Sequence, residues 1–298
     1  MQLSTGFRER SSLSGQNDLQ AIGRHGKLSL KFRKGGDRTV LHDSFSNIPM
    51  QAFQPFYLDE TGCAYAYIVN PTGGLVGGDR IDTDITINDY AHAFITTPSA
   101  TKVYRSSGNF SMQNTNIMVK RNGIIEYMPG YVIPFGGSLF SQKTKVFMEE
   151  AATAFILDSF TTGRVSSGEH LCFGEYRSTT EIEYCGVPIV TDKILLRPDV
   201  IDYNDLGFLE SFTVMAVLYI VFDNPPLEKP LMNDIKNLMD GMNDILGGVS
   251  ALPSRGVAVR LLGTATFPAE KALITLWSAA RKRILNLESF PSSRMFSL

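Results

Sequence analysis

The chain has 298 residues, of which 43% are hydrophobic and 19% charged, and its formal net charge is -2. This composition indicates a globular protein with enough apolar residues for a substantial core. The near-neutral charge gives no electrostatic reason to expect nucleic acid or an anionic membrane as a partner. The longest strongly apolar run, residues 212–222, is well short of the ~20 residues that cross a bilayer, so we expect a buried core element there.

The cysteines and the start of the chain indicate a cytoplasmic protein. Cys63, Cys172 and Cys185 are widely spaced and odd in number, which favours neither a disulfide framework nor a zinc knuckle and fits a reducing compartment. Residues 1–14 are polar and lack the apolar centre of a secretory signal. Residues 1–25 carry few apolar side chains, and we expect a flexible lead-in there.

Alternation with a period of two dominates residues 27–197 and predicts an all-β region. In residues 27–33 and again in residues 80–87, apolar side chains take every second position, as in half-buried strands. Asn122-Gly123, between residues 116–120 and 124–128, predicts a β-hairpin with a type I′ turn. Cys185-Gly186, between residues 181–184 and 188–196, predicts a second hairpin.

The last third changes character and predicts a β-α-β-α portion that contributes two helices. Apolar residues from Leu231 to Ile245 follow four-three spacing, the stripe of an amphipathic helix that Gly247-Gly248 would end. A second helix is expected after Pro268, with an acidic start and a basic end that suit the helix dipole. Residues 212–222 and 257–262 are expected strands. We therefore expect one domain over 26–298, all-β over 26–206 and mixed α/β over 207–298.

Residues 70–79 form the densest local signal, because four glycines fall within six positions. A phosphate cradle does not fit, since no Gly-Lys-Ser/Thr follows and Asp79 would repel a phosphate. A bulged turn between strands is the structural alternative. Asp79, Asp82 and Asp84 then form a small acidic set, which suits either weak and exchangeable metal binding or a solvated strand face.

Two further aspartates occupy apolar surroundings. Asp158 ends the run 154–157, and Asp192 lies within the apolar residues 188–196. A carboxylate in such a strand is costly unless it is paired, hydrogen-bonded or in contact with water. Arg164 and Lys193 are possible ion-pair partners in sequence. A half-buried ion pair and an internal polar channel both remain open at this point.

The familiar catalytic and cofactor motifs do not occur. The sequence has no His-Glu-x-x-His, Gly-x-Ser-x-Gly, Cys-x-x-Cys or P-loop pattern, and its four histidines are scattered. We expect each histidine to be structural or exposed. A hydrolase that uses paired carboxylates such as Asp158 and Glu169 stays open as an alternative.

Taken in chain order, five motifs resemble the urease accessory protein family UreD, also called UreH. The glycine-rich segment 70–79 comes first, and Ala100-Thr101-Lys102-Val103-Tyr104-Arg105 follows it. Glu126-Tyr127-Met128-Pro129, Gly163-Arg164 and Gly168-Glu169 complete the series. The resemblance is dense from about residue 26 to residue 197 and thinner over residues 256–283; residues 1–25 lie outside it.

The resemblance implies a β-helix-like stack of strands with two helices, and a scaffold for nickel delivery rather than an enzyme. It implies UreF, UreG and the urease apoprotein as partners, no tightly bound cofactor, and nickel in transit through an internal polar tunnel. Its tunnel-associated positions are Asp79, Thr101, Asp158 and Asp192, with weak and transient metal binding at Asp79. The matching motif residues that would support them are Gly77, Gly78, Lys102, Arg105, Glu126, Arg164 and Glu169.

Two of these positions differ in detail from the family, since serine can also stand at Thr101 and glutamate at Asp192. Both differences keep a polar group. The scarcity of Cys and His is expected for such a path, because strong thiolate or imidazole ligands would trap a nickel ion that has to move on. A purely structural adaptor between UreF and urease remains an alternative to the tunnel.

Overall fold

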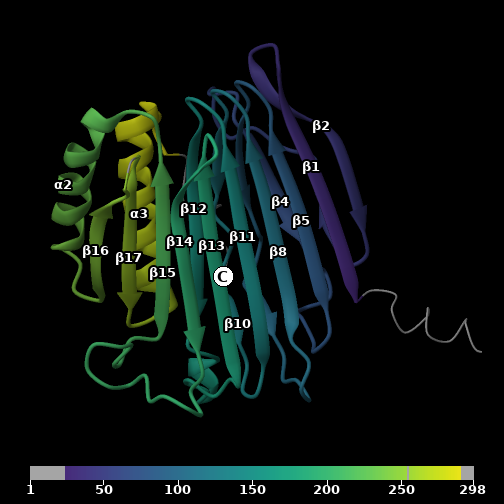
Figure 1. The fold of residues 1–298 in the computed structure, drawn as a ribbon, viewed down its shortest axis with the longest axis vertical. Coiled ribbons are helices and arrows are strands. Elements are labelled where there is room, and N and C mark those ends of the chain that lie inside the picture. Colours follow the sequence, from purple (N-terminus) through teal and green to yellow (C-terminus); the bar gives the residue numbers. More distant parts are fainter. Residues whose placement is uncertain (1–23, 254, 290–298) are drawn as a thin grey trace, which may run out of the picture.

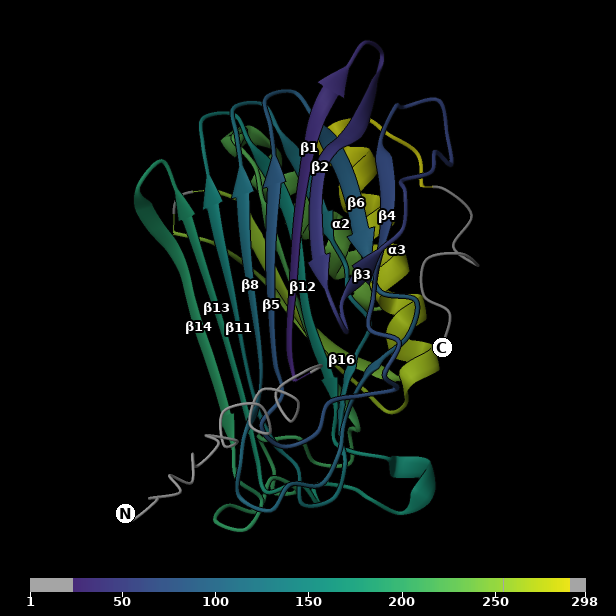
Figure 2. The same cartoon turned by 90° about the vertical axis from the view of Figure 1, so that its right-hand side faces the viewer.

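The structure is a computed structural model that describes residues 24–253 and 255–289. Almost all of the lead-in expected over residues 1–25 lies outside this range. Of the two residues of that segment that are described, His25 already opens the first strand. Figure 2 shows three layers edge-on: a first sheet, a second sheet behind it, and two helices on the far side of the second sheet.

Within residues 24–253 and 255–289, seven strands form the first sheet and ten form the second. In spatial order the first sheet contains β14 (Val187–Leu196), β13 (Glu175–Tyr184), β11 (Leu139–Met148), β8 (Ser111–Val119), β5 (Arg80–Ile87), β1 (His25–Gly35) and β2 (Arg38–Asn47). The second contains β16 (Ile245–Ala251), β17 (Val257–Gly263), β15 (Val214–Val221), β12 (Thr153–Thr161), β9 (Ile124–Tyr127), β6 (His92–Thr96), β4 (Ala64–Val69) and β3 (Gln51–Ala52), with β10 (Val132–Pro134) and β7 (Thr101–Val103) attached beside β12.

The chain winds between the two sheets as a coil. β5, β8, β11 and β13 lie parallel and side by side in the first sheet, and β4, β6, β9 and β12 do so in the second. From β4 to β13 the chain passes back and forth between the sheets, so each turn of the coil adds one parallel strand to each, and the short strands β7 and β10 are extra members of the second sheet (Figure 1). The expected mainly-β, β-helix-like arrangement with two helices is therefore confirmed.

Two hydrophobic cores follow from the alternation of side chains along the strands. The first fills the space between the sheets and includes Leu30, Ile85 and Phe140. The second lies between the second sheet and the helices α2 (Glu228–Met239) and α3 (Thr266–Leu285), and Trp277 is fully buried in it. Within the described residues no helix is long and apolar enough to cross a membrane.

One predicted hairpin is confirmed and the other is wrong. Cys185 and Gly186 both have positive φ and join the antiparallel strands β13 and β14. Asn122 also has positive φ, but β8 and β9 on either side of it belong to different sheets. The turn residues predicted a sharp reversal correctly. They carry no information on the parallel neighbours that each strand then pairs with.

The predicted first helix is too long, and a strand was missed. α2 ends at Met239, so Met242 and Ile245 do not continue its apolar face, and Ile245 begins β16. Gly247 and Gly248 lie inside that edge strand rather than ending a helix. A Cβ at Gly247 would lie 2.8 Å from the carbonyl oxygen of Arg260, so close strand packing requires glycine there. The C-terminal order is β-α-β-β-α.

Candidate functional site

Polar side chains cross the interior of the sandwich in two adjacent rows on the first sheet. Strand register aligns Thr83, Thr115, Thr144, Thr180 and Asp192 from β5 to β14. The neighbouring row aligns Gln113, Gln142 and Ser178. These positions alternate with outward-facing ones and share their side of the sheet with the first core. Since neighbouring strands lie ~4.8 Å apart, the longer row spans about 19 Å.

Asp158 on β12 faces these rows from the second sheet. Gln142 donates a hydrogen bond from Nε2 to Asp158 Oδ1 at 2.7 Å, and Ser178 Oγ donates to Oδ2 at 2.5 Å. The same Gln142 nitrogen lies 3.2 Å from the Tyr176 hydroxyl. Asp158 thus accepts from neutral groups inside the protein and not from Arg164. We call the two rows, together with Asp158 and Tyr219, the polar track.

The polar track ends at Asp192, on the edge strand β14. The Tyr219 hydroxyl donates to Asp192 Oδ2 at 2.5 Å, and the Arg260 guanidinium contacts the same oxygen. Tyr219 and Arg260 come from β15 and β17 of the second sheet, so the contact joins the two sheets. Of the two alternatives left open by the sequence, a half-buried ion pair is present at Asp192, although its cation is Arg260 and not Lys193.

At its other end the polar track meets a cavity of about 120 Å³. The inward side chains of Thr83 and Gln113 line it together with the sequence-predicted Thr101 and Lys102 on β7. Gly73 and Gly74 are also part of the lining, which brings the glycine-rich segment to the cavity. A Cβ on Gly74 would lie 2.6 Å from the Lys102 carbonyl oxygen, so this close approach explains the glycine.

Asp79 holds the glycine-rich segment in place from outside the cavity lining. Its Oδ2 accepts a hydrogen bond from the Val76 backbone at 2.9 Å, and its own carbonyl accepts one from Met112 at 2.8 Å. Gly77, where a Cβ would lie 2.3 Å from Ser106 Oγ, and Gly78, with φ of 95°, shape the same turn. The segment is a crossover from β4 to β5 between the sheets. The role of Asp79 in metal binding stays a prediction.

The remaining sequence-predicted residues lie elsewhere. Arg164 forms a two-point ion pair with Glu169, which also accepts a hydrogen bond from the Gly136 backbone at 3.0 Å. These contacts, with the nearby charge of Arg105, lower the pKa of Glu169 to about 2. This cluster fastens the loop after β12. Asp158 and Glu169 share none of their hydrogen-bond partners.

Glu126 lies on the opposite side of the second sheet, facing α3. It is fully buried and accepts hydrogen bonds from His92 Nε2 at 2.7 Å, Trp277 Nε1 at 2.6 Å and Arg281 Nε at 3.2 Å. Burial works against its ionisation, but these three groups together lower the pKa of Glu126. We call Glu126, His92, Trp277 and Arg281 the helix-anchoring cluster.

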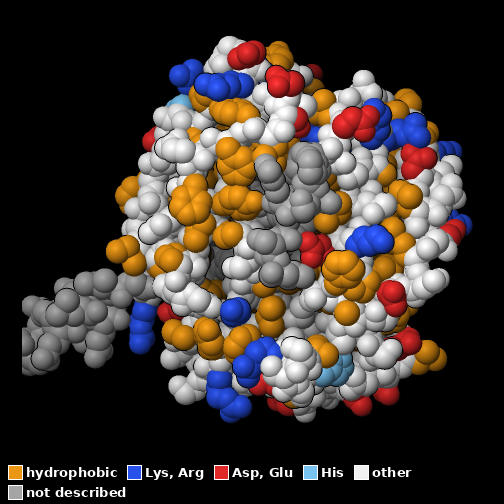
Figure 3. Space-filling model, turned by 180° about the vertical axis from the view of Figure 1, so that it is seen from behind, with side chains coloured by type: hydrophobic (Ala, Val, Ile, Leu, Met, Phe, Trp, Pro, Cys, Tyr) orange, Lys and Arg blue, Asp and Glu red, His pale blue; other side chains and the backbone are white. Residues whose placement is uncertain are grey.

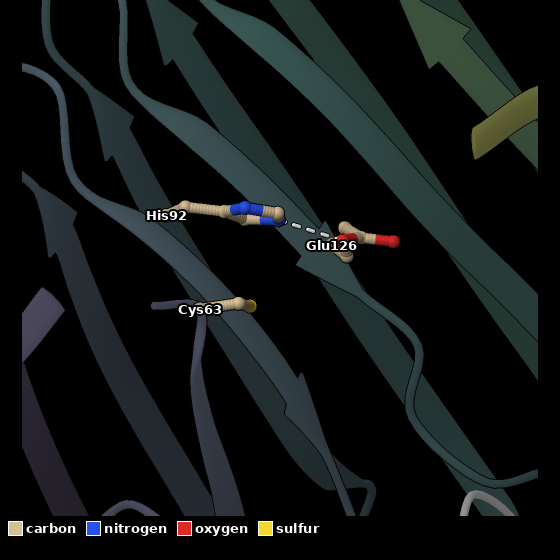
Figure 4. Close-up of side chains that lie close together, drawn as sticks. All are labelled: Cys63, His92 and Glu126. Atoms are coloured by element: carbon tan, nitrogen blue, oxygen red, sulfur yellow. Dashed lines mark hydrogen bonds and ion pairs between the residues drawn. The ribbon is translucent and has the colours of Figure 1, made fainter. Parts of the chain in front are cut away.

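Cys63 lies near this cluster and, with His92 and Glu126, makes a group of three side chains of the types that bind metal ions. Its Sγ, a His92 nitrogen and a Glu126 oxygen all lie within 4.8 Å of one another (Figure 4). Burial raises the pKa of the Cys63 thiol well above its ordinary range, so the group is a neutral thiol. The Arg281 guanidinium already neutralises Glu126. The arrangement is therefore an anchor for α3 and a poor site for a cation.

Burial sets the ionisation of Asp158. Desolvation raises its pKa, the Ser178 and Gln142 hydrogen bonds lower it, and the nearby Asp192 charge raises it, with a net value of about 6. An acid with this pKa stands ionised at neutral pH but gains a proton just below it. The polar track therefore carries a carboxylate whose charge is sensitive to its surroundings.

The raised pKa predicts a pH-dependent effect of Asp158→Asn on stability. The folded pKa of about 6 lies above the unfolded value of 3.8, so the folded state loses stability as pH rises from about 4 through 6. Asn keeps the shape without the charge. We expect the variant to gain about 2 kcal/mol over the parent between pH 4 and 7, measured by urea unfolding across that range.

Asp82→Asn is the matched comparison, because it should behave in the opposite way. Asp82 lies on the outward face of β5, where hydrogen bonds from Asn114, His25 and Arg80 outweigh partial burial and lower its pKa to about 2. That variant should lose stability relative to the parent as pH rises from 2 to 4. An Asp158→Asn difference that stays constant over pH 4–7 would contradict a raised pKa at Asp158.

The fold and the site define a class: a two-sheet β-coil protein with an internal polar track and an outer helical layer. On the surface visible in Figure 3, acidic and basic side chains are interspersed with apolar ones. Comparison with known proteins then identifies the family. The family model described as UreD urease accessory protein matches residues 24–295, and the chain belongs to this family.

Relatives of similar length share about three residues in ten. The chain is 30% identical to the urease accessory protein UreD of Acaryochloris marina over 282 residues, covering 94% of this chain and 97% of the relative. It is 31% identical to UreD of Actinomyces naeslundii over 241 residues, covering 81% and 88%. For UreD of Bacillus cereus the identity is 27% over 263 residues, covering 88% and 96%.

Proposed function

We propose that this chain is a non-catalytic accessory protein that helps to load nickel into urease. With UreF and UreG it would form a complex on the urease apoprotein in the cytoplasm, and nickel would pass through the polar track. Membership in the UreD family supports the accessory role. The observation that carries the conducting role is Asp158, a carboxylate held by Gln142 and Ser178 in the interior between the two sheets.

The chemistry of the polar track suits a metal ion that moves. Its side chains offer hydroxyl, amide and carboxylate oxygens, which bind a divalent transition metal weakly enough to exchange. Rows of such groups also hydrogen-bond water and can replace part of an ion's hydration shell. No tightly bound cofactor is needed for this role, because the nickel ion is the cargo. The cavity beside Thr101 and Lys102 would be one opening of the path.

A hydrolase that pairs Asp158 with Glu169 finds less support. Glu169 is bound to Arg164 and to the Gly136 backbone, whereas Asp158 is bound to Gln142 and Ser178. The two carboxylates therefore have separate surroundings. A purely structural adaptor between UreF and urease shares the accessory role but gives no reason for an ionisable carboxylate in the sandwich interior, where it costs stability.

Deleting this chain tests the accessory role. In cells that make the urease subunits, we expect the apoprotein to accumulate at its usual level but to lose nearly all its nickel and activity. A plasmid copy of the chain should restore both. The measurement is nickel per purified urease by elemental analysis. Fully loaded urease in the deletion strain would overturn the proposal.

A further inference from the structure

The Arg260 side chain lies over the β14 end of the polar track. Arg260 projects from β17 toward the first sheet and contacts Asp192 Oδ2. Its side chain is 58% exposed, whereas that of Asp192 is 15% exposed. The guanidinium therefore lies between the half-buried carboxylate and solvent. Arginine stays protonated at any physiological pH, so this cover is always positively charged.

The Arg260 guanidinium takes the position at the Asp192 carboxylate that a metal ion would need. Its Oδ2 receives both the Tyr219 hydroxyl and the Arg260 guanidinium. A divalent cation approaching this oxygen would meet a positive charge at contact distance, which repels it. Asp192 can serve a cation only when Arg260 has moved away.

An unsatisfied hydroxyl in the polar track lies next to this position. Thr180 pairs in register with Asp192 and is 2% exposed. Its Oγ1 is close enough to Asp158 to lower the pKa of that carboxyl, yet among the described residues it meets no partner in hydrogen-bond geometry. Buried hydroxyls are normally satisfied by protein or by a bound species. Thr180 therefore offers a further buried oxygen beside Asp158 and Asp192.

Arg260 has room to move away from Asp192. It lines a groove of about 520 Å³ between the edge strands β14 and β16, whose walls are mainly apolar and include Leu195, Met215 and Leu246. Because the Arg260 side chain is 58% exposed, its guanidinium can reach solvent when the pair breaks, and the cost falls on the 15% exposed Asp192, which then needs another cation. Arg260 can swing into the groove without disturbing either sheet.

We infer that Arg260 is the gate of the polar track. In the resting chain it masks Asp192 and keeps divalent cations out. When Arg260 is drawn into the groove, Asp192, with Tyr219 and Thr180 beside it, becomes an oxygen site for a divalent cation. The inference rests on the proposed nickel path and adds a way in which entry of the ion at Asp192 is regulated. Arg260 acts by positioning charge at Asp192 and is not itself a ligand.

Nickel titration of the purified full chain tests the gate. The affinity for Ni²⁺ alone is measured in competition with a chromophoric chelator, and thermal unfolding is recorded for every variant. Arg260→Gln should bind Ni²⁺ about tenfold more tightly than the parent, because a full positive charge leaves the site. Arg260→Lys should stay close to the parent, since its charge is kept. Adding Asp192→Asn to Arg260→Gln should abolish the gain.

The chain offers a matched control in a second Tyr–Asp–Arg contact. Asp223 accepts a hydrogen bond from the Tyr184 hydroxyl at 2.9 Å and contacts Arg255, beyond the end of β15 and outside the polar track. Arg255→Gln removes the same charge there and should leave Ni²⁺ affinity at the parent value. An unchanged affinity in Arg260→Gln would overturn the gate, and so would an equal rise in Arg255→Gln.

Nickel loading of urease separates the gate from the path. If the path exists without this gate, Asp158→Ala lowers the nickel content of urease, whereas Arg260→Gln changes neither the Ni²⁺ affinity of the chain nor the loading of urease. This result overturns the gate and leaves the path standing. If the gate exists without the path, Arg260→Gln still binds Ni²⁺ more tightly through Asp192 while Asp158→Ala leaves loading unchanged. That second pattern overturns the proposed nickel path and supports a gated cation site.

Discussion

Glu126→Gln is expected to destabilise the chain by about 3–5 kcal/mol, because it removes the fully buried carboxylate paired with the buried Arg281 and leaves that guanidinium with the longer 3.7 Å ion pair to Asp59. Arg281 is fully buried on α3, one helical turn from Trp277, and both donate to Glu126 from the opposite layer. The helix-anchoring cluster is thus a buried polar contact that holds α3 on the second sheet. The loss is measured as a change in the free energy of unfolding by urea denaturation.

A double variant separates the buried charge from the loss of packing. Glu126→Gln combined with Arg281→Met removes both charges, and we expect it to recover much of the lost stability. Glu149→Ala is the exposed control. Glu149 pairs with Lys120 at 2.7 Å with both side chains well exposed, so it should cost no more than about 1 kcal/mol. A Glu126→Gln variant as stable as Glu149→Ala would rule out the anchoring role.

Alternation of apolar residues predicted the fold class because each strand has one face in the core and one face toward solvent. Each strand of the first sheet buries one face in the first core and exposes the other, as the period-two pattern of Arg80–Ile87 shows. The period-two pattern does not predict that the chain winds between two sheets. Asn122-Gly123 looks like a hairpin turn in sequence, yet it delivers β9 to the second sheet, because pairing partners more than 20 residues away decide the topology.

The missed strand has a similar explanation. Ile245 continues the helical spacing of Leu231 and Ile235, and paired glycines commonly end helices. The structure places the helix end earlier, at Met239, and uses Gly247 and Gly248 where β16 packs against β17. Local spacing could not reveal this, because the requirement comes from the backbone of Arg260 on the neighbouring strand.

The sequence located Asp158 and Asp192 but not what surrounds them. Four strands of the first sheet repeat one inward pattern, apolar residues on either side of polar ones, as in Tyr176, Ser178, Thr180 and Ile182. That repetition was a readable signal for a polar row. The partnership of Asp192 with Arg260 was not, since 68 residues separate them and only the packing of the two sheets brings them together.

Asp158→Ala is expected to leave the chain folded and assembled but unable to load urease. Removing this carboxylate deletes a negative charge of the polar track and leaves the Gln142 amide and Ser178 hydroxyl without their acceptor. Because the residue lies between the sheets, its loss should leave the outer surface of the chain unchanged. We expect nickel per urease to fall about tenfold or more, corresponding to about 1.4 kcal/mol or more for passage of the ion.

Asp84→Ala serves as the matched control. Asp84 faces outward from β5 and accepts a hydrogen bond from Asn116 at 2.9 Å. The Asp84→Ala substitution therefore removes one aspartate without changing the interior. Asp79→Ala tests the glycine-rich crossover in the same assay. Loading that falls in Asp84→Ala as much as in Asp158→Ala would indicate a general loss of fold or charge and not a path through the interior.

The nickel content of urease matured with the Asp158→Ala chain tests the nickel path through the polar track, provided that the accessory complex is recovered at parental yield. A path through the polar track predicts nickel-poor, inactive urease with the complex intact, and parental loading with Asp84→Ala. Parental nickel content with Asp158→Ala would contradict the path and leave the chain as an adaptor.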